Sequence, residues 1–234
     1  MQEKILTDVS PGLRELHQKG CATLNQGDAE GAIAIFNQIL EQEPGLVECR
    51  LVLRRAQLLR AKKHDGFFNR AADEVREFPE LAEAETHLRS SPLKALRAAE
   101  QALNRVPNSI LAHRLFAKAA LNAHMPYTAL LSLNFIYNHV PENIETTLDL
   151  VGALASTGRV REAVSICGRM QKDYPDDARV VKALGFLGKL AFDAHTNEMS
   201  RAAARRFFKS RAANLDPMRI ESIGRARTSL RVHE

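Results

Sequence analysis

Apolar residues recur along this chain at intervals of three and four positions, with polar residues between them. Such spacing places the apolar side chains on one face of an amphipathic helix, and strand-type alternation is absent. The helical pattern is clearest in two stretches: Ile33, Phe36, Ile39 and Leu40, and Leu130, Leu133 and Ile136. The sequence therefore predicts an all-α protein.

Prolines mark a repeat within this pattern. Pro107, Pro141 and Pro175 follow one another at intervals of 34 residues, and Pro44 and Pro217 close similar segments. An alanine stands twelve residues before four of these prolines, and in three cases a larger apolar residue follows one helical turn later. The alanines are Ala32, Ala95, Ala129 and Ala163, the larger residues are Phe36, Leu133 and Cys167, and Arg205 breaks the pattern in the last segment. A small residue followed by a large one is typical of helices in close contact, so the repeat predicts stacked helix–turn–helix units.

Turn residues separate the predicted helices. Residues 25–28 and 156–158 contain glycine among polar residues and interrupt two of the segments midway. Ser91-Pro92 is expected to start a helix, with Ser91 as the N-cap and Pro92 at the first helical position, and Met125-Pro126 is a similar start.

In its period and in these residues the chain resembles the tetratricopeptide repeat family. The motif of that family has a bulky residue, a Leu-Gly pair and an aromatic on the first helix, then Ala, Phe, Ala and Pro on the second. The matching residues are Leu16, Gly20, Gly27, Ala32, Phe36 and Pro44 in segment 13–46; Phe116, Ala117, Ala129, Leu133 and Pro141 in segment 110–143; Leu150, Leu154, Gly158, Ala163 and Pro175 in segment 144–177; and Leu184, Gly185, Ala212, Leu215, Asp216 and Pro217 in segment 178–219.

The resemblance implies a right-handed superhelix of about five to six stacked units with a C-terminal capping helix. The expected organisation is a lead-in (1–10), a solenoid (11–217) and a basic capping helix or tail (218–234). The expected units are 13–46, 47–80, a trimmed 81–109, 110–143, 144–177 and 178–219. Residues 64–91 also allow a second interpretation, a long insertion into one unit, although the phenylalanines Phe67, Phe68 and Phe78 favour a packed helix.

The family resemblance also implies a binding surface, because the first helices of its units line a concave groove that holds a partner segment. The residues at groove positions are Arg114, Lys118, Asn122, Arg179, Lys182, Phe186 and Lys189. Cationic and amide donors in that arrangement favour a protein or peptide partner that carries carboxylates, since charge-assisted hydrogen bonds are the stronger ones. The alternative is that Arg114, Lys118 and Lys182 form only a solvated face.

The family's chaperone-tail binders use lysine and asparagine side chains as a carboxylate clamp. Here His17 and Cys21 occupy those positions in the first unit, and Leu148 and Gly152 occupy them in the fifth. The sequence therefore disfavours binding of a heat-shock-protein tail.

Charge is concentrated at the C-terminus. The formal net charge is +5, and the residues from Arg201 to Glu234 include nine basic and three acidic side chains, which leaves one net negative charge for the rest. The densest part is a basic surface formed by Arg201, Arg205, Arg206, Lys209 and Arg211. Such a segment attracts nucleic acid or anionic lipid, or it forms a well-solvated capping helix in which Phe207 and Phe208 pack on the preceding repeat. The capping interpretation is favoured, and nucleic acid and membrane are the less favoured partners.

The remaining residues show no pattern typical of catalysis. Cys21, Cys49 and Cys167 are far apart without a CxxC pair, which indicates a reducing compartment and a cytoplasmic protein, and no signal peptide or membrane span is predicted. The eight histidines form no HExxH or Cys/His cluster, residues 185–190 lack the spacing of a phosphate loop, and there is no GxSxG. We therefore expect no enzyme activity, no cofactor and no metal site.

These observations predict a non-enzymatic scaffold or adaptor that binds a partner peptide or helix in a concave groove. Two alternatives stay open: a nucleic-acid-associated regulator that uses residues 201–231, and a chaperone of the secretion type. Self-association is also left open, since solenoids have exposed ends.

Overall fold

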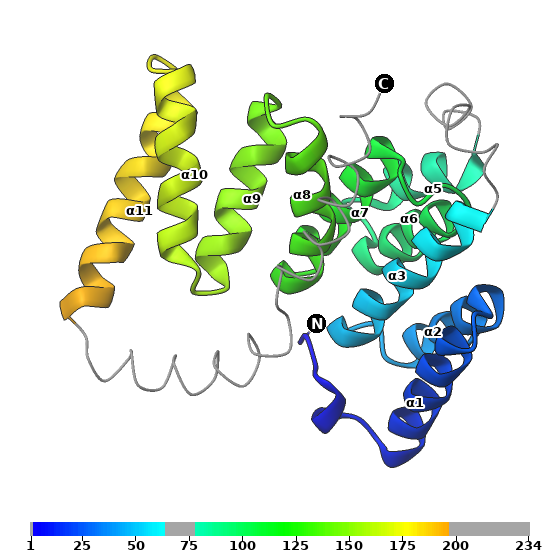
Figure 1. Ribbon diagram of the computed structural model, residues 1–234. Helices are drawn as coiled ribbons and strands as arrows, with labels where there is room; N and C mark the ends of the chain where they lie inside the picture. Colours follow the sequence, from blue (N-terminus) through cyan, green and yellow to red (C-terminus); the bar gives the residue numbers. More distant parts are fainter. Residues whose placement is uncertain (1, 64–77, 197–234) are drawn as a thin grey trace, which may run out of the picture. The chain divides into compact units, whose positions relative to one another are not determined.

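The computed structural model describes residues 2–63 and 78–196, with side chains for residues 2–62 and 78–191 (Figure 1). These residues form ten α-helices and one short 3-10 helix, so the predicted all-α class is confirmed for this part of the chain. The elements are η1 (Leu6–Asp8), α1 (Pro11–Asn25), α2 (Ala29–Gln42), α3 (Val47–Lys63), α5 (Pro79–His87), α6 (Pro92–Arg105), α7 (Ile110–Asn122), α8 (Pro126–His139), α9 (Ile144–Ser156), α10 (Val160–Asp173) and α11 (Ala178–Thr196). The predicted helix from Phe67 to Phe78 and the predicted capping helix fall on residues outside this part, except that Phe78 precedes α5.

One compact unit, Met1–Leu190, contains nearly all of the described helices, and a second unit begins at Ala191. Within the first unit each helix packs against its neighbour in sequence, from α1 to α3 and again from α5 to α10. Short loops join these neighbours, which is why successive helices form antiparallel hairpins. No helix among the described residues is both long enough and apolar enough to cross a membrane.

The repeated prolines lie just beyond helix ends. Pro44, Pro107, Pro141 and Pro175 each follow the last residue of α2, α6, α8 or α10 by two positions. Proline restricts the residue before it to extended conformations, so the backbone leaves the helix at Glu43, Val106, Val140 and Tyr174. The 34-residue proline spacing therefore records where every second helix stops.

Side chains and prolines also fix where the helices begin. The N-cap residues Ser10, Asp28, Ser109 and Asn143 each accept a hydrogen bond from a backbone N–H in the first turn. The predicted starts at Pro92 and Pro126 are confirmed, but the Ser91 side chain forms no capping hydrogen bond. Ser91 is the N-cap residue of α6, as predicted, and Pro92 occupies the first helical position.

The predicted turns rely on glycine. Gly27 and Gly158 adopt φ angles of 87° and 79°, in the left-handed region that glycine enters at little cost. Each follows a first helix, α1 or α9, and allows the next helix to fold back on it.

The core is built from the small and large residues of the repeat. Ala32, Ala95, Ala129 and Ala163 are fully buried, as are the larger residues that follow them, Phe36, Leu133 and Cys167. Gly20 on α1 lets α2 approach closely, because a methyl group there would lie 2.7 Å from the ring of Phe36. The repeated pair of a small residue and a larger apolar residue therefore marks the positions where neighbouring helices pack closely.

The buried apolar residues form two clusters. One lies between Val9 and Ala56 and the other between Leu81 and Leu187. In a repeat array each unit contacts only its neighbours, but α3 also packs against α8, which lies four helices further along the chain in the element order of the described residues. The arrangement thus departs from simple nearest-neighbour stacking.

Candidate functional site

Helices α7, α9 and α11 are the first helices of the last three predicted units, and they carry all seven predicted groove residues. We call the charged and exposed side chains on these helices the α7–α9–α11 face. It comprises Arg114, Lys118 and Asn122 on α7; Glu145, Asp149 and Gly152 on α9; and Arg179, Lys182, Phe186 and Lys189 on α11.

Charges on the three helices interact with one another. Lys118 Nζ on α7 lies 2.7 Å from Glu145 Oε1 on α9. The hydrogen bond and charge of Lys118 lower the pKa of Glu145, and the charges of Arg114 and Arg179 lower it further. The Glu145 carboxylate is therefore attracted by cationic side chains on both α7 and α11, and this attraction links the three helices.

Three of the predicted donors are already engaged within the chain. Besides Lys118, Asn122 donates from Nδ2 to the carbonyl oxygen of Leu88 at 2.8 Å. Arg179 forms an ion pair of 2.7 Å with Asp177, and this hydrogen bond lowers the pKa of Asp177 to about 2. These side chains would have to exchange an existing contact in order to hold a partner.

The other four predicted residues are more available. Arg114, Lys182 and Lys189 make no hydrogen bond or ion pair within the described ranges, and Arg114 Nε is buried without a hydrogen-bond partner there. The Phe186 side chain is 60% exposed, the most of any large apolar residue described, and Val181, elsewhere on α11, is 49% exposed. Exposed aromatic surface next to free cations is a feature of protein-binding sites.

The acidic residues Glu145 and Asp149 and the open space at Gly152, all on α9, were not predicted from the sequence. Asp149 is partly buried, and its pKa is raised by burial and by the charge of Glu145. An added Cβ at Gly152 would meet no atom within 4 Å, so this exposed glycine leaves open space on the face. Glu145 stands at the same position of its repeat unit as Arg179, which was predicted to line the groove, so Glu145 could have been predicted in the same way. Asp149 does not stand at one of these groove positions.

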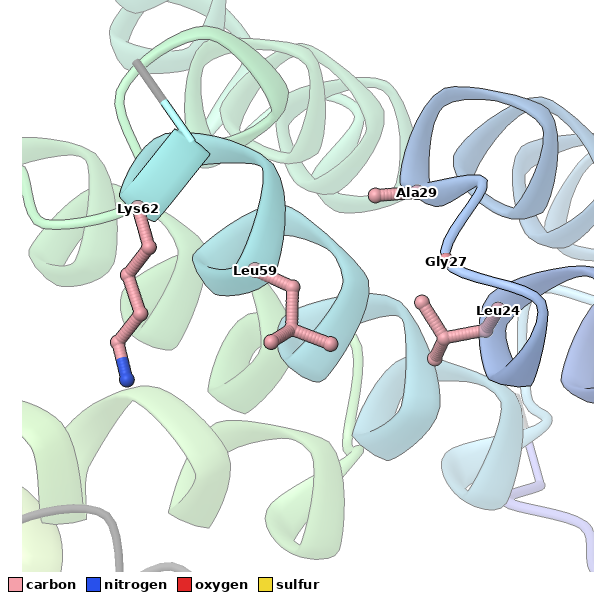
Figure 2. A pocket seen from close by; sticks show the side chains of 5 residues that line it. All are labelled: Leu24, Gly27, Ala29, Leu59 and Lys62. Atoms are coloured by element: carbon pink, nitrogen blue, oxygen red, sulfur yellow. The ribbon is translucent and has the colours of Figure 1, made fainter. Parts of the chain in front are cut away.

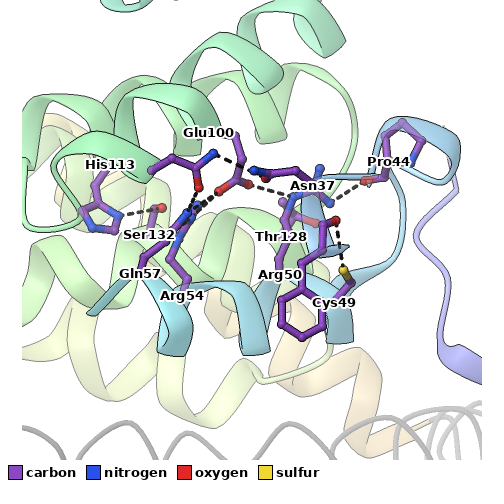
Figure 3. Close-up of polar contacts among 12 residues, drawn as sticks. Asn37, Pro44, Cys49, Arg50, Arg54, Gln57, Glu100, His113, Thr128 and Ser132 are labelled. Atoms are coloured by element: carbon purple, nitrogen blue, oxygen red, sulfur yellow. Dashed lines mark hydrogen bonds and ion pairs between the residues drawn. The ribbon is translucent and has the colours of Figure 1, made fainter. Parts of the chain in front are cut away.

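A second polar cluster lies between the two apolar clusters (Figure 3). Arg50 and Arg54 on α3 both pair with Glu100 on α6, with Arg50 Nε 3.4 Å from Glu100 Oε2. Gln57 donates to Asn104 at 2.6 Å, and the guanidinium of Arg54 stacks 4.6 Å from the ring centroid of Phe116. Because its charges are buried and paired with one another, this cluster joins α3 to α6 and α7 and offers no open site.

His113 belongs to the interior as well. Its Nδ1 lies 2.9 Å from Ser132 Oγ (Figure 3), and its Nε2 lies 2.9 Å from the carbonyl oxygen of Pro107. Since the carbonyl can only accept, Nε2 carries the hydrogen and Nδ1 accepts from the hydroxyl. Burial, with a contribution from the charge of Arg54, lowers the pKa of His113 to about 3 and keeps the ring neutral. The ring also stacks on Phe135 with 3.9 Å between centroids.

The cysteines are held as thiols inside the fold. Cys49 and Cys167 are buried and donate to backbone carbonyls, and burial raises the pKa of all three thiols. A raised thiol pKa disfavours the nucleophilic thiolate. In the part of the chain that the structure describes, no group of histidine, cysteine and carboxylate side chains is arranged to hold a metal ion.

A small apolar hollow lies where α1 turns into α2 beside the end of α3 (Figure 2). Its lining residues are Leu24, Gly27, Ala29, Leu59 and Lys62, and its volume is about 230 Å³. It contains no converging polar groups of the kind that orient a small-molecule ligand. The predicted basic residues Arg201, Arg205, Arg206, Lys209 and Arg211 lie outside the described residues.

Comparisons with known proteins give a distant likeness. No protein-family model and no curated protein sequence matches the chain. Among solved structures, the crystal structure of MamA protein is similar with a TM-score of 0.41 and 15% identity, over 88% of this chain and 92% of that chain. A likeness at this level assigns neither a function nor a family.

Proposed function

We propose that this protein is a non-enzymatic scaffold of the tetratricopeptide repeat type, and that a partner peptide or helix binds across the α7–α9–α11 face. The repeat of 34 residues and its buried alanines support the family proposal. The observation that carries the functional proposal is the exposed Phe186 on a face where Lys182 and Lys189 are unpaired within the described ranges. An aromatic anchor flanked by free cations fits an apolar side chain between carboxylates on the partner.

The α9 residues refine the expected partner. Glu145 and Asp149 place negative charge between the cations of α7 and α11. A uniformly acidic segment would be repelled there, so the partner is expected to carry mixed charge, with carboxylates opposite Arg114 and Lys182. Electrostatic complementarity of this kind selects the partner and sets its register more than it sets the affinity.

Reversing the charge of the unpaired cations tests this function. The variant Arg114→Glu/Lys182→Glu is expected to lower partner capture at least tenfold, because attraction at two points becomes repulsion. Lys118 stays unchanged, since Glu145 already pairs with it. The measurement is quantitative capture from native lysate, treated with nuclease, with the full-length chain as bait.

The matched control is Arg161→Glu/Lys172→Glu, which makes the same change of charge at exposed positions of α10. Both variants are expected to melt within a few degrees of the unaltered chain, because neither removes a hydrogen bond or ion pair formed within the described ranges. If both variants lost capture equally, the change in net charge would explain the loss, and the proposal that the partner binds the α7–α9–α11 face would be contradicted.

The chain's basic C-terminal segment supports a second candidate, a nucleic-acid-associated regulator. It rests on the charge of residues 201–231 in the sequence. Capture that disappears with nuclease, or an affinity that falls steeply with salt, would favour this candidate over the scaffold.

A further inference from the structure

Residues 2–6 bind to segments far away in the sequence. The Glu3 carboxylate, 7% exposed, accepts hydrogen bonds from the backbone N–H groups of Tyr127 at 3.0 Å and Thr128 at 2.6 Å. These two N–H groups belong to the first turn of α8, where no earlier carbonyl is available to them. A side chain from the start of the chain thus supplies the acceptor that an N-cap side chain would give, and Met125 at that position has no such side chain.

The backbone next to Glu3 is held by the loop between α2 and α3. Lys4 N donates to the carbonyl oxygen of Gly45 at 2.9 Å, and the carbonyl oxygen of Lys4 accepts from Val47 N at 3.3 Å. This pairing is a parallel β-bridge between Lys4 and Leu46. The backbone N–H of Leu6 then donates to the Glu48 carboxylate, so three backbone groups of Lys4 and Leu6 are held by residues 45–48.

The loop is shaped for this segment. A methyl group on Gly45 would lie 2.6 Å from the backbone carbonyl oxygen of Gln2, so only glycine allows the two backbones to approach. Lys4 Nζ lies 2.6 Å from Glu43 at the other end of the loop. Steric fit, backbone pairing and a side-chain contact therefore coincide on residues 2–6.

The charges around Glu3 favour a carboxylate. The N-terminal end of a helix carries a partial positive charge, and the nearby Arg50 adds a full one. Burial raises the pKa of Glu3, while the two N–H groups and the charge of Arg50 act in the opposite direction. A neutral glutamine would lose most of this attraction while keeping the same shape.

We propose that the first turn of α8, the loop of residues 43–46 and the first two residues of α3 form a docking site for an extended, glutamate-bearing peptide segment, which residues 2–6 fill in cis as an exchangeable ligand. This site is separate from the α7–α9–α11 face and does not depend on the proposed scaffold function. Because the cis segment is tethered, it acts at an effective concentration on the order of millimolar. A segment from another polypeptide, such as a second copy of this chain, therefore competes only when it binds more tightly or when the cis segment is weakened.

Binding of a peptide in trans tests the site. The probe is a fluorescent peptide with the sequence of residues 1–9, and the protein is the full chain with Glu3→Ala and Lys4→Pro. These changes remove the carboxylate and the N–H that hold the cis segment. Fluorescence anisotropy is expected to give a Kd at least tenfold lower for this variant than for the unaltered chain.

Two controls isolate the chemistry. A Glu3→Gln peptide is expected to bind at least tenfold more weakly, since hydrogen bonds to a charged acceptor are worth more than neutral ones. Adding Gly45→Ala to the variant chain is expected to abolish binding, because the methyl group occupies the space of the Gln2 backbone. No binding to the variant chain at about 1 mM peptide, or equal binding of the two peptides, would overturn the proposal.

A milder variant covers the case in which the double replacement unfolds the chain. In the full-length Glu3→Gln protein, the Tyr127 and Thr128 amides are expected to exchange hydrogen at least fivefold faster, and excess unaltered peptide is expected to restore their protection. Unchanged exchange, or exchange that the peptide leaves fast, contradicts an exchangeable carboxylate at this site.

Discussion

Replacing Glu100 with alanine is expected to lower the free energy of unfolding by about 3–5 kcal/mol. Glu100 is 6% exposed and pairs with both Arg50 and Arg54, of which Arg50 is 3% exposed. Without the carboxylate two guanidinium groups would remain inside the protein with no counter-charge, and burying an unpaired charge is strongly unfavourable. Chemical denaturation, with the fitted slope compared between variants, measures the loss.

An exposed ion pair provides the control for this prediction. Glu162 pairs with Arg159 at 2.6 Å, but its side chain is 54% exposed. Glu162→Ala is therefore expected to change stability by less than about 1 kcal/mol. If Glu100→Ala were equally mild, water would have to reach Arg50 and Arg54, and the cluster would not hold α3 against α6.

Lowering the pH from 6.5 to 4.5 is expected to reduce the free energy of unfolding by about 2 kcal/mol through His113 alone. Folding lowers the pKa of His113 from 6.5 to about 3. Between these two values the unfolded chain binds a proton that the folded chain excludes, so stability falls as the pH falls. The loss continues until the pH reaches the folded pKa. Urea denaturation across this pH range measures it.

The comparison with two histidine variants assigns the effect. His113→Gln, which can still donate to the Pro107 carbonyl, is expected to flatten the pH dependence by this amount whatever its stability at pH 7. His139→Gln removes an exposed imidazole stacked on Phe135 and serves as the comparison for the loss of a histidine at the surface. Burial also lowers the pKa of His17, and its contribution cancels because it is present in all three proteins. An unaltered slope in His113→Gln would contradict a buried neutral ring.

The local features of the fold could be predicted from the sequence. Pro107, Pro141 and Pro175 fix helix ends through the backbone of the preceding residue, and Ala129 and Ala163 mark close helix contacts. Each signal acts within a few residues, so periodicity alone makes it visible. The missing side-chain cap at Ser91 shows the limit of this reasoning, because Pro92 sets the helix start whether or not the hydroxyl takes part.

The contacts between helices far apart in the sequence, which hold together the compact unit Met1–Leu190, could not be predicted in this way. Glu3 contacts α8 at a separation of 125 residues, and Arg54 reaches Glu100 at a separation of 46. Neither pair has a periodic or local signature, since each depends on how α3 packs against helices beyond its neighbours. Of the two carboxylates between the donors on α7 and α11, Glu145 lies at a groove position of the repeat and could have been predicted, whereas Asp149 lies at none of these positions.

The open space at Gly152 gives the most direct test of partner binding on the α7–α9–α11 face. Gly152→Trp is expected to reduce partner capture at least tenfold, because Gly152 is exposed, an added Cβ meets no atom within 4 Å, and the indole would fill the open space on the face. Gly168→Trp on α10 is the matched control, since that helical glycine is equally free of neighbours. Capture should persist in the control after nuclease treatment and in about 0.5 M salt, where exposed charge interactions are screened. Loss in the Gly152 variant alone would establish the face as the binding surface, and equal capture by the two variants would contradict it.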